Sequence, residues 1–126
     1  MDSSAAVELL RANATVVSAW SRAVGVRLPA PALGELLYGA RRSKRPGVNV
    51  RAVWDLAATM PLIPCDEPVC RAYADIKSVL AVQGDMIPEN DLWIAACALS
   101  RDLAIVSSDQ HFDVVPGLLR EDWSGR

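Results

Sequence analysis

The sequence predicts an α/β domain of three layers, in which a short parallel sheet is covered by helices on both faces. Helical segments alternate along the chain with short runs that are apolar on both faces, as in strands buried between two layers. The chain has 126 residues, of which 52% are hydrophobic and 22% charged, which is typical of one folded domain. No internal repeat or long linker divides it, so residues 1–126 are expected to form a single domain.

The first half of the chain should contain four helices and two strands. Helical periodicity of the apolar residues indicates the first two helices. Pro31 suits the first position of a helix, and Pro46 and Gly47 separate the third helix from the fourth. Prolines on both sides of Leu62 and Ile63 limit that strand to few hydrogen bonds. The expected helices are Ala5–Leu10, Ala14–Val24, Pro31 to about Arg42 and Val48–Thr59, and the expected strands are Val26–Ala30 and Pro61–Pro64.

The second half should continue the alternation with two helices and two strands. Asp66 has the side chain of a helix N-cap. The loop Gly84–Pro88 ends this helix, and Asn90 lies at the start of an almost wholly apolar one. The expected helices are Asp66 to about Val82 and Leu92–Leu99, and the expected strands are Leu103–Val106 and, at a sheet edge, Leu118–Asp122.

Four acidic residues lie where such a fold places its functional side chains, beyond the carboxyl ends of the parallel strands. Asp109 follows the strand Leu103–Val106 after two serines. Asp91 lies in the first turn of the apolar helix, where the helix dipole favours its ionised form. Glu35 lies early in the third helix, and Asp2 directly precedes the first. Taken singly, each is also an ordinary dipole partner or turn residue.

Convergence of these acids would create a site for hard divalent cations. Two carboxylates about 4 Å apart repel by about 4 kcal/mol at an effective dielectric of about 20, so a cluster cannot stay ionised without cations. Oxygen ligands without histidine or cysteine suit Mg²⁺ or Mn²⁺ better than zinc. Such ions commonly serve phosphodiester cleavage. Glycine-rich nucleotide loops and a serine-hydrolase elbow are absent from the sequence, which argues against those enzyme classes.

The acids belong to four sequence motifs. These are Asp2-Ser3-Ser4, Leu33-Gly34-Glu35-Leu36-Leu37-Tyr38-Gly39-Ala40, Asn90-Asp91-Leu92-Trp93-Ile94-Ala95-Ala96, and Val106-Ser107-Ser108-Asp109-Gln110-His111-Phe112 followed by Val115-Pro116-Gly117-Leu118. In order and spacing they resemble the PIN-domain family and, within it, the VapC-type toxins of toxin–antitoxin pairs. One such motif would be a weak signal, whereas four that cover nearly the whole chain are specific.

The resemblance implies a PIN fold with an acidic pocket that binds Mg²⁺ or Mn²⁺. It implies an endoribonuclease that acts as a toxin, forms a homodimer, and is blocked by an antitoxin that inserts a basic or aromatic segment. Metal binding and catalysis would fall to four acids supported by two serines, namely Asp2, Glu35, Asp91 and Asp109 with Ser4 and Ser107. RNA would be held, despite the net charge of −2, by a basic run made of Arg41, Arg42, Lys44 and Arg45.

The first strand of the family, an apolar run before the opening acid, has no counterpart here because only Met1 precedes Asp2. That strand is central in the fold, so its absence would leave unpaired backbone groups and an unfilled core, and Asp2 would lie on a frayed terminus. Two interpretations stay open. Either the true start lies upstream of Met1, which the intact motifs favour, or the chain is a catalytically weakened or inactive relative that acts by binding an antitoxin. Ser4 also stands where the family often has Asn.

The remaining reactive or aromatic residues are expected to have structural roles. His111, the single histidine, lies near the predicted pocket rim, but a lone histidine is more often a packed or solvent-facing ring. Trp54 and Trp93 lie on apolar helical stretches and are expected in the core or at a dimer face. No secretory signal or membrane-spanning run is found, so the chain is expected in the cytoplasm.

Overall fold

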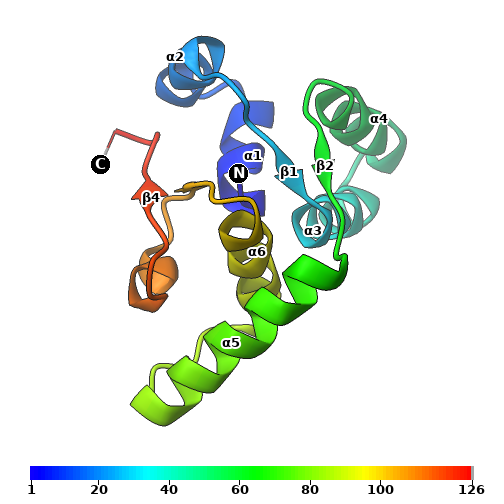
Figure 1. The fold of residues 1–126 in the computed structure, drawn as a ribbon. Coiled ribbons are helices and arrows are strands. Elements are labelled where there is room, and N and C mark those ends of the chain that lie inside the picture. Colours follow the sequence, from blue (N-terminus) through cyan, green and yellow to red (C-terminus); the bar gives the residue numbers. More distant parts are fainter. Residues whose placement is uncertain (126) are drawn as a thin grey trace.

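The computed structural model describes residues 1–125 as helices packed around short parallel strands, which confirms the α/β class (Figure 1). Helices and strands alternate as predicted, although each strand is shorter than its apolar run. A 3₁₀ helix after the third strand was not predicted. The α-helices are α1 (Ser3–Leu10), α2 (Ala14–Arg22), α3 (Ala30–Arg41), α4 (Pro46–Ala57), α5 (Glu67–Gln83) and α6 (Glu89–Ser100); the strands are β1 (Leu28–Pro29), β2 (Leu62–Ile63), β3 (Ile105–Val106) and β4 (Arg120–Glu121); the 3₁₀ helix is η1 (Gln110–Val114).

Capping side chains set several of the helix ends. The Asp2 carboxylate accepts a hydrogen bond from the Ala5 amide at 2.9 Å, so α1 begins two residues earlier than its periodicity predicts. Asp66 caps α5 as predicted, by accepting from the Val69 amide. Gly84 ends α5 in the left-handed conformation with φ of 75°, which glycine adopts without the steric cost of a Cβ atom.

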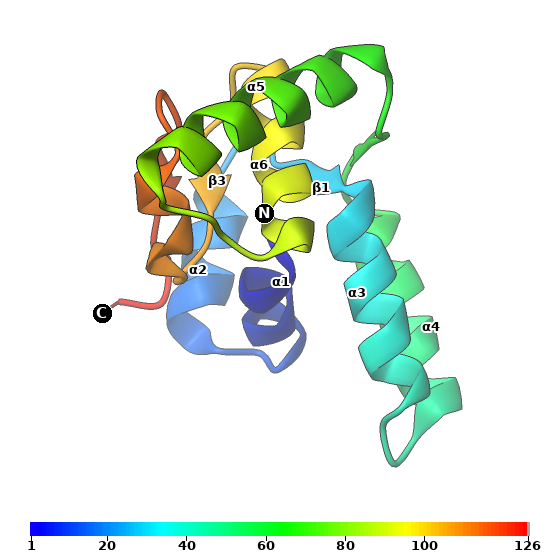
Figure 2. The ribbon, with the colours of Figure 1, turned by 90° about the horizontal axis from the view of Figure 1, so that it is seen from below.

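Helix α6 is the centre of the core. Its segment Ile94–Ala98 is at most 5% exposed, and α5 packs along it while α3 and η1 contact it elsewhere (Figures 1 and 2). Trp93 stacks on Tyr73 of α5 with ring centroids 3.8 Å apart. Trp54, in contrast, is 52% exposed and lies outside the core. No helix within residues 1–125 is both long and apolar enough to cross a membrane.

The strands form two parallel pairs rather than one continuous sheet. Leu28 of β1 lies opposite Leu62 of β2, and Ile105 of β3 lies opposite Arg120 of β4. The parallel direction confirms the prediction. The single central sheet expected from the sequence is therefore divided into the pair β1–β2 and the pair β3–β4.

Met1 and Asp2 lie between the two strand pairs and bond to both. The Met1 amino group donates to the Arg27 carbonyl at 2.9 Å, and the Asp2 amide donates to the Val106 carbonyl at 3.0 Å. Both residues are buried, with 5% and 4% of their surface exposed. The expectation of a frayed Asp2 is therefore wrong, because hydrogen bonds to both sides and burial hold the terminus in place.

The buried amino group of Met1 makes stability depend on pH. Burial lowers the pKa of this group from its usual 8.0 to about 6, although the Asp2 carboxylate acts in the opposite direction. Between pH 6 and 8 the unfolded chain therefore binds more protons than the folded chain, so this group should make the free energy of unfolding rise with pH by about 2 kcal/mol. N-terminal acetylation removes the charge and should remove this part of the slope. Urea unfolding of both forms at pH 6, 7 and 8 checks the prediction, and equal slopes would contradict it.

Candidate active site

Four acidic side chains from distant parts of the sequence meet beside the N-terminal end of α6. Asp2 caps α1, and Glu35 lies in the second turn of α3. Asp91 lies in the first turn of α6, as predicted, and Asp109 caps η1 just after β3. The fold therefore brings together the ends of segments that the sequence analysis singled out.

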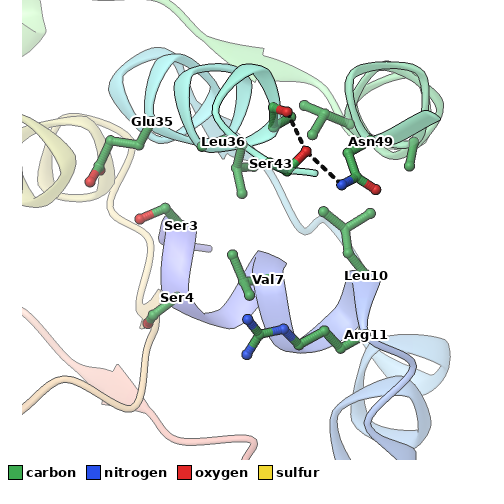
Figure 3. Close-up of a pocket in the computed structure, with 13 residues that line it drawn as sticks. Ser3, Ser4, Val7, Leu10, Arg11, Glu35, Leu36, Ser43 and Asn49 are labelled. Atoms are coloured by element: carbon green, nitrogen blue, oxygen red, sulfur yellow. Dashed lines mark hydrogen bonds between the residues drawn. The ribbon is translucent and has the colours of Figure 1, made fainter. Parts of the chain in front are cut away.

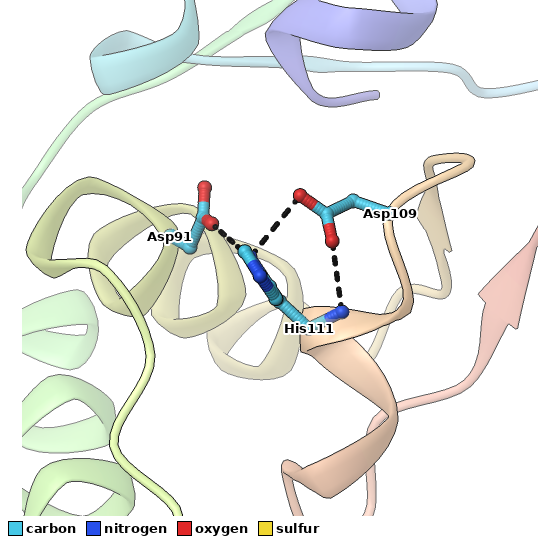
Figure 4. A group of neighbouring side chains, drawn as sticks. All are labelled: Asp91, Asp109 and His111. Atoms are coloured by element: carbon cyan, nitrogen blue, oxygen red, sulfur yellow. Dashed lines mark hydrogen bonds and ion pairs between the residues drawn. The ribbon is translucent and has the colours of Figure 1, made fainter.

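Asp91 and Asp109 face each other across the ring of His111 (Figure 4). The Nδ1 atom of His111 lies 3.4 Å from Asp91 Oδ2 and 3.2 Å from Asp109 Oδ2. One ligand atom from each of the three residues lies within 4.8 Å of the others. The sequence favoured a structural role for His111, whereas the structure places its ring between two of the predicted acids.

Asp2 is held by hydroxyl groups on both sides. Ser4 Oγ donates to its carboxylate at 2.9 and 3.0 Å, and the fully buried Ser107 Oγ donates at 2.5 Å. Ser107 Oγ also accepts from the Asp109 amide at 2.9 Å. Both serines thus contact one of the four predicted acids, and Ser107 links Asp2 to the backbone that carries Asp109.

Glu35 lies near Asp91 and Asp2 and carries an unsatisfied oxygen. Its Oε1 atom is buried and has no hydrogen-bond partner within the described part of the chain. Burial raises the pKa of Glu35, and the Asp91 and Asp2 carboxylates raise it further, while Asn90 and Ser3 partly offset this. Asn90 and Ser3 are neighbours that sequence reasoning did not single out, although each adjoins a predicted acid.

The pKa of Asp91 shows the same crowding of negative charge. Burial is the largest cause that raises the pKa of Asp91, and the Asp109 and Asp2 carboxylates raise it further. A hydrogen bond from His111 acts in the opposite direction. The Asp2 and Asp109 carboxylates thus act on the pKa of Asp91, and the Asp91 and Asp2 carboxylates act on the pKa of Glu35. The four acids therefore share one electrostatic environment.

The sequence profile of the PIN domain matches residues 1–118, a region that contains all four acids. This chain belongs to the PIN-domain family. Ribonuclease VapC2 from Haemophilus influenzae is 34% identical over 92 residues, which are 72% of this PIN-domain chain and 70% of that protein. The tRNA(fMet)-specific endonuclease VapC of Shigella flexneri is 34% identical over 93 residues, 73% of this chain and 70% of its own. The solved structure of VapBC-1 from nontypeable Haemophilus influenzae matches with a TM-score of 0.86 at 26% identity, covering 98% of this chain and 96% of that one.

The side chains of this PIN domain fit a hard divalent cation. The unpartnered Oε1 atom of Glu35 lacks the positive or hydrogen-bonding neighbour that a buried carboxylate oxygen needs. Asp91 and Asp109 each offer a further carboxylate oxygen, and these two atoms lie within 4.8 Å of each other. Carboxylate oxygens are the ligands that Mg²⁺ and Mn²⁺ prefer, and a cation among them would relieve their repulsion.

A groove of about 520 Å³ runs from the acidic site of the PIN domain between α1, α3 and α4 (Figure 3). Glu35 lies at one end of it and Arg11 lies along its wall. Its lining is mixed, with apolar side chains between polar ones. The apolar residues include Val7, Leu36 and Val53. The groove therefore offers an elongated, partly apolar surface with a carboxylate at one end.

The basic run lies at the tip of the α3–α4 hairpin, which projects from the body of the PIN domain (Figure 2). Arg41 ends α3, and all four basic side chains of the run are exposed. The Arg42 guanidinium donates to the Tyr38 hydroxyl at 2.8 Å and lies over its ring, 5.5 Å from the centroid. Seven residues of helix separate Glu35 from Arg42, a rise of about 10 Å. The tip is thus a positive surface about two helical turns from the acids.

Proposed function

We propose that this PIN domain is a metal-dependent endoribonuclease that acts as the toxin of a VapBC-type toxin–antitoxin pair. The observation that carries the proposal is the convergence of four acids beside the start of α6, where burial and mutual repulsion raise the pKa of Glu35 and Asp91. Relatives over most of the chain are named as ribonuclease and tRNA endonuclease, and the VapBC-1 structure shares the fold.

Mg²⁺ or Mn²⁺ is the proposed cofactor. When bound, the ion would activate water for attack on the phosphodiester and stabilise the charge that develops on the phosphate oxygens. The contribution of the chain is to hold the ligands in place, since Ser4 and Ser107 fix the Asp2 carboxylate from two sides. Ser107 fixes the start of η1 as well, through the Asp109 amide. The proposed metal ligands are Asp2, Glu35, Asp91 and Asp109.

The proposal is tested by cleavage of a mixed pool of transfer and messenger RNA. The purified protein should produce discrete internal cuts in the presence of Mg²⁺ or Mn²⁺, and none with EDTA. Transfer RNA belongs in the pool because one relative is named as a tRNA endonuclease. Cleavage that persists with the chelator would contradict metal dependence. Absence of cleavage with either ion would instead favour an inactive module that acts by binding an antitoxin.

The α3–α4 tip is the proposed RNA contact. Its exposed cations would neutralise backbone phosphates and guide the strand toward the acids, which themselves repel RNA. The hairpin projects from the body of the domain (Figure 2) and its four cations are exposed, which suits contact with an extended strand. The proposed contacts are Arg41, Arg42, Lys44 and Arg45.

Neutralising part of this tip should weaken RNA binding and its dependence on salt. In an Asp91→Asn background, chosen because it should cut RNA far more slowly, replacing Lys44 and Arg45 by Gln should remove two phosphate contacts. The slope of log affinity against log salt should then fall by about 1.4 for a single strand. Arg71→Gln on α5, also an exposed cation, is the control and should leave the slope unchanged. Fluorescence anisotropy at several salt concentrations measures both. Equal slopes in all proteins would remove the tip from the RNA-binding surface.

The groove between α1, α3 and α4 is the proposed antitoxin site. The apolar side chains of an antitoxin segment would pack against Val7, Leu36 and Val53 in the groove. A basic side chain of that segment would then reach Glu35 and displace the metal. Such binding would block the acidic site in the proposed toxin–antitoxin complex. A homodimer is also proposed, for which the exposed side chains of Trp54 on α4 and Leu62 on β2 offer apolar surface.

A further inference from the structure

His111 holds a position that the four-acid site does not explain. Its side chain is 54% exposed, so it is not a packed core ring. The backbone turn at the start of η1 directs it inward, because the Asp109 carboxylate accepts from the His111 amide at 2.9 Å through its Oδ1 atom. The other oxygen of that carboxylate then faces the imidazole Nδ1 atom at 3.2 Å.

We infer that His111 is a nitrogen ligand of the metal ion and shifts the preference of the site from Mg²⁺ toward Mn²⁺. This inference rests on the proposed function. Two ligands at right angles about one ion, each about 2.1 Å from it, lie about 3 Å apart. The separations from Nδ1 to Asp109 Oδ2 and Asp91 Oδ2, 3.2 and 3.4 Å, are close to that spacing.

The direction of the preference follows from ligand chemistry. Mg²⁺ takes oxygen ligands almost exclusively and keeps several waters, so it gains little from an imidazole. Mn²⁺ binds nitrogen ligands more weakly than the later divalent transition ions do. It nevertheless accepts an imidazole nitrogen together with carboxylates. A site of carboxylates and one imidazole should therefore hold Mn²⁺ more tightly than a site of carboxylates alone, while its affinity for Mg²⁺ changes little.

The test measures ion binding and not cleavage. Calorimetric titration of the full chain with MnCl₂ and with MgCl₂ should show that His111→Ala loses about 10-fold in Mn²⁺ affinity and less than about 3-fold in Mg²⁺ affinity. His111→Asn, which keeps a polar side chain, should behave likewise. Gln110→Ala, a neighbouring exposed residue of η1, is the matched control and should bind both ions as the unchanged chain does.

Pulsed electron paramagnetic resonance gives an independent readout. The Mn²⁺ complex of the unchanged chain should show coupling to imidazole nitrogen, and this coupling should vanish in His111→Ala. Equal losses for both ions in His111→Ala, or no nitrogen coupling in the unchanged chain, would overturn the inference and leave the proposed nuclease intact. Failure of the unchanged chain to bind either ion would overturn the proposed function, and the inference with it.

Discussion

Asp91→Asn should reduce RNA cleavage by on the order of 100-fold or more and leave the chain folded. The loss of a side chain that merely hydrogen-bonds a metal ligand already costs 10- to 100-fold, so loss of a ligand should cost at least as much. The substitution keeps the size of the side chain and removes one charge from a crowded site, so the fold should not suffer. Initial rates on a defined RNA, at saturating Mg²⁺ or Mn²⁺, measure the effect.

Asp55→Asn is the matched control for this experiment. Asp55 is an exposed acid on α4, so it undergoes the same chemical change outside the acidic site. Its cleavage rate should equal that of the unchanged chain. If Asp91→Asn cuts RNA as fast as Asp55→Asn does, any cleavage observed comes from a contaminating nuclease or from another site, and the acids are not the catalytic centre.

Two of the acids could be placed from the sequence because local rules set their positions. Asp109 follows an apolar strand, and Asp91 lies in the first turn of an apolar helix, so both had to lie at element ends. In a parallel α/β fold the carboxyl ends of the strands share one edge, which brings such residues together. The same reasoning explains why the α/β class was predictable from the alternation of helices and short apolar runs.

The arrangement of Asp2 could not be predicted because it depends on distant partners. Nothing near Asp2 in the sequence indicates that the Arg27 and Val106 carbonyls hold the terminus on its two sides. The direction of the His111 ring was missed for a related reason. An Asp followed two residues later by His permits the side-chain-to-backbone turn seen at Asp109, but only the fold shows that Asp91 lies on the other side of the ring.

Mg²⁺ or Mn²⁺ should raise the melting temperature of the unchanged chain by about 10 °C. At an ion concentration about 100 times the Kd, binding to the folded state adds about 2.7 kcal/mol. In a domain of this size each kcal/mol moves the melting temperature by about 3–5 °C. Differential scanning fluorimetry with and without the ion measures the shift. A melting temperature that does not respond to millimolar Mg²⁺ or Mn²⁺ would contradict a metal site at the acids.

Glu35→Gln should distinguish the stability that the metal adds from the stability that is lost by keeping Glu35 ionised in a buried, crowded site. Because the pKa of Glu35 is raised, the folded chain binds its proton more tightly than the unfolded chain does, and ionisation costs stability as pH rises through that raised pKa. A neutral amide avoids this cost, so Glu35→Gln should melt higher than the unchanged chain without metal at neutral pH. With metal, the order should reverse, since Glu35→Gln has lost a ligand and gains little from the ion. Such a crossover is expected only if the cost of burying and crowding these carboxylates is tolerated for the sake of cation binding. If Glu35 were purely structural, Glu35→Gln would instead lower the melting temperature both with and without metal.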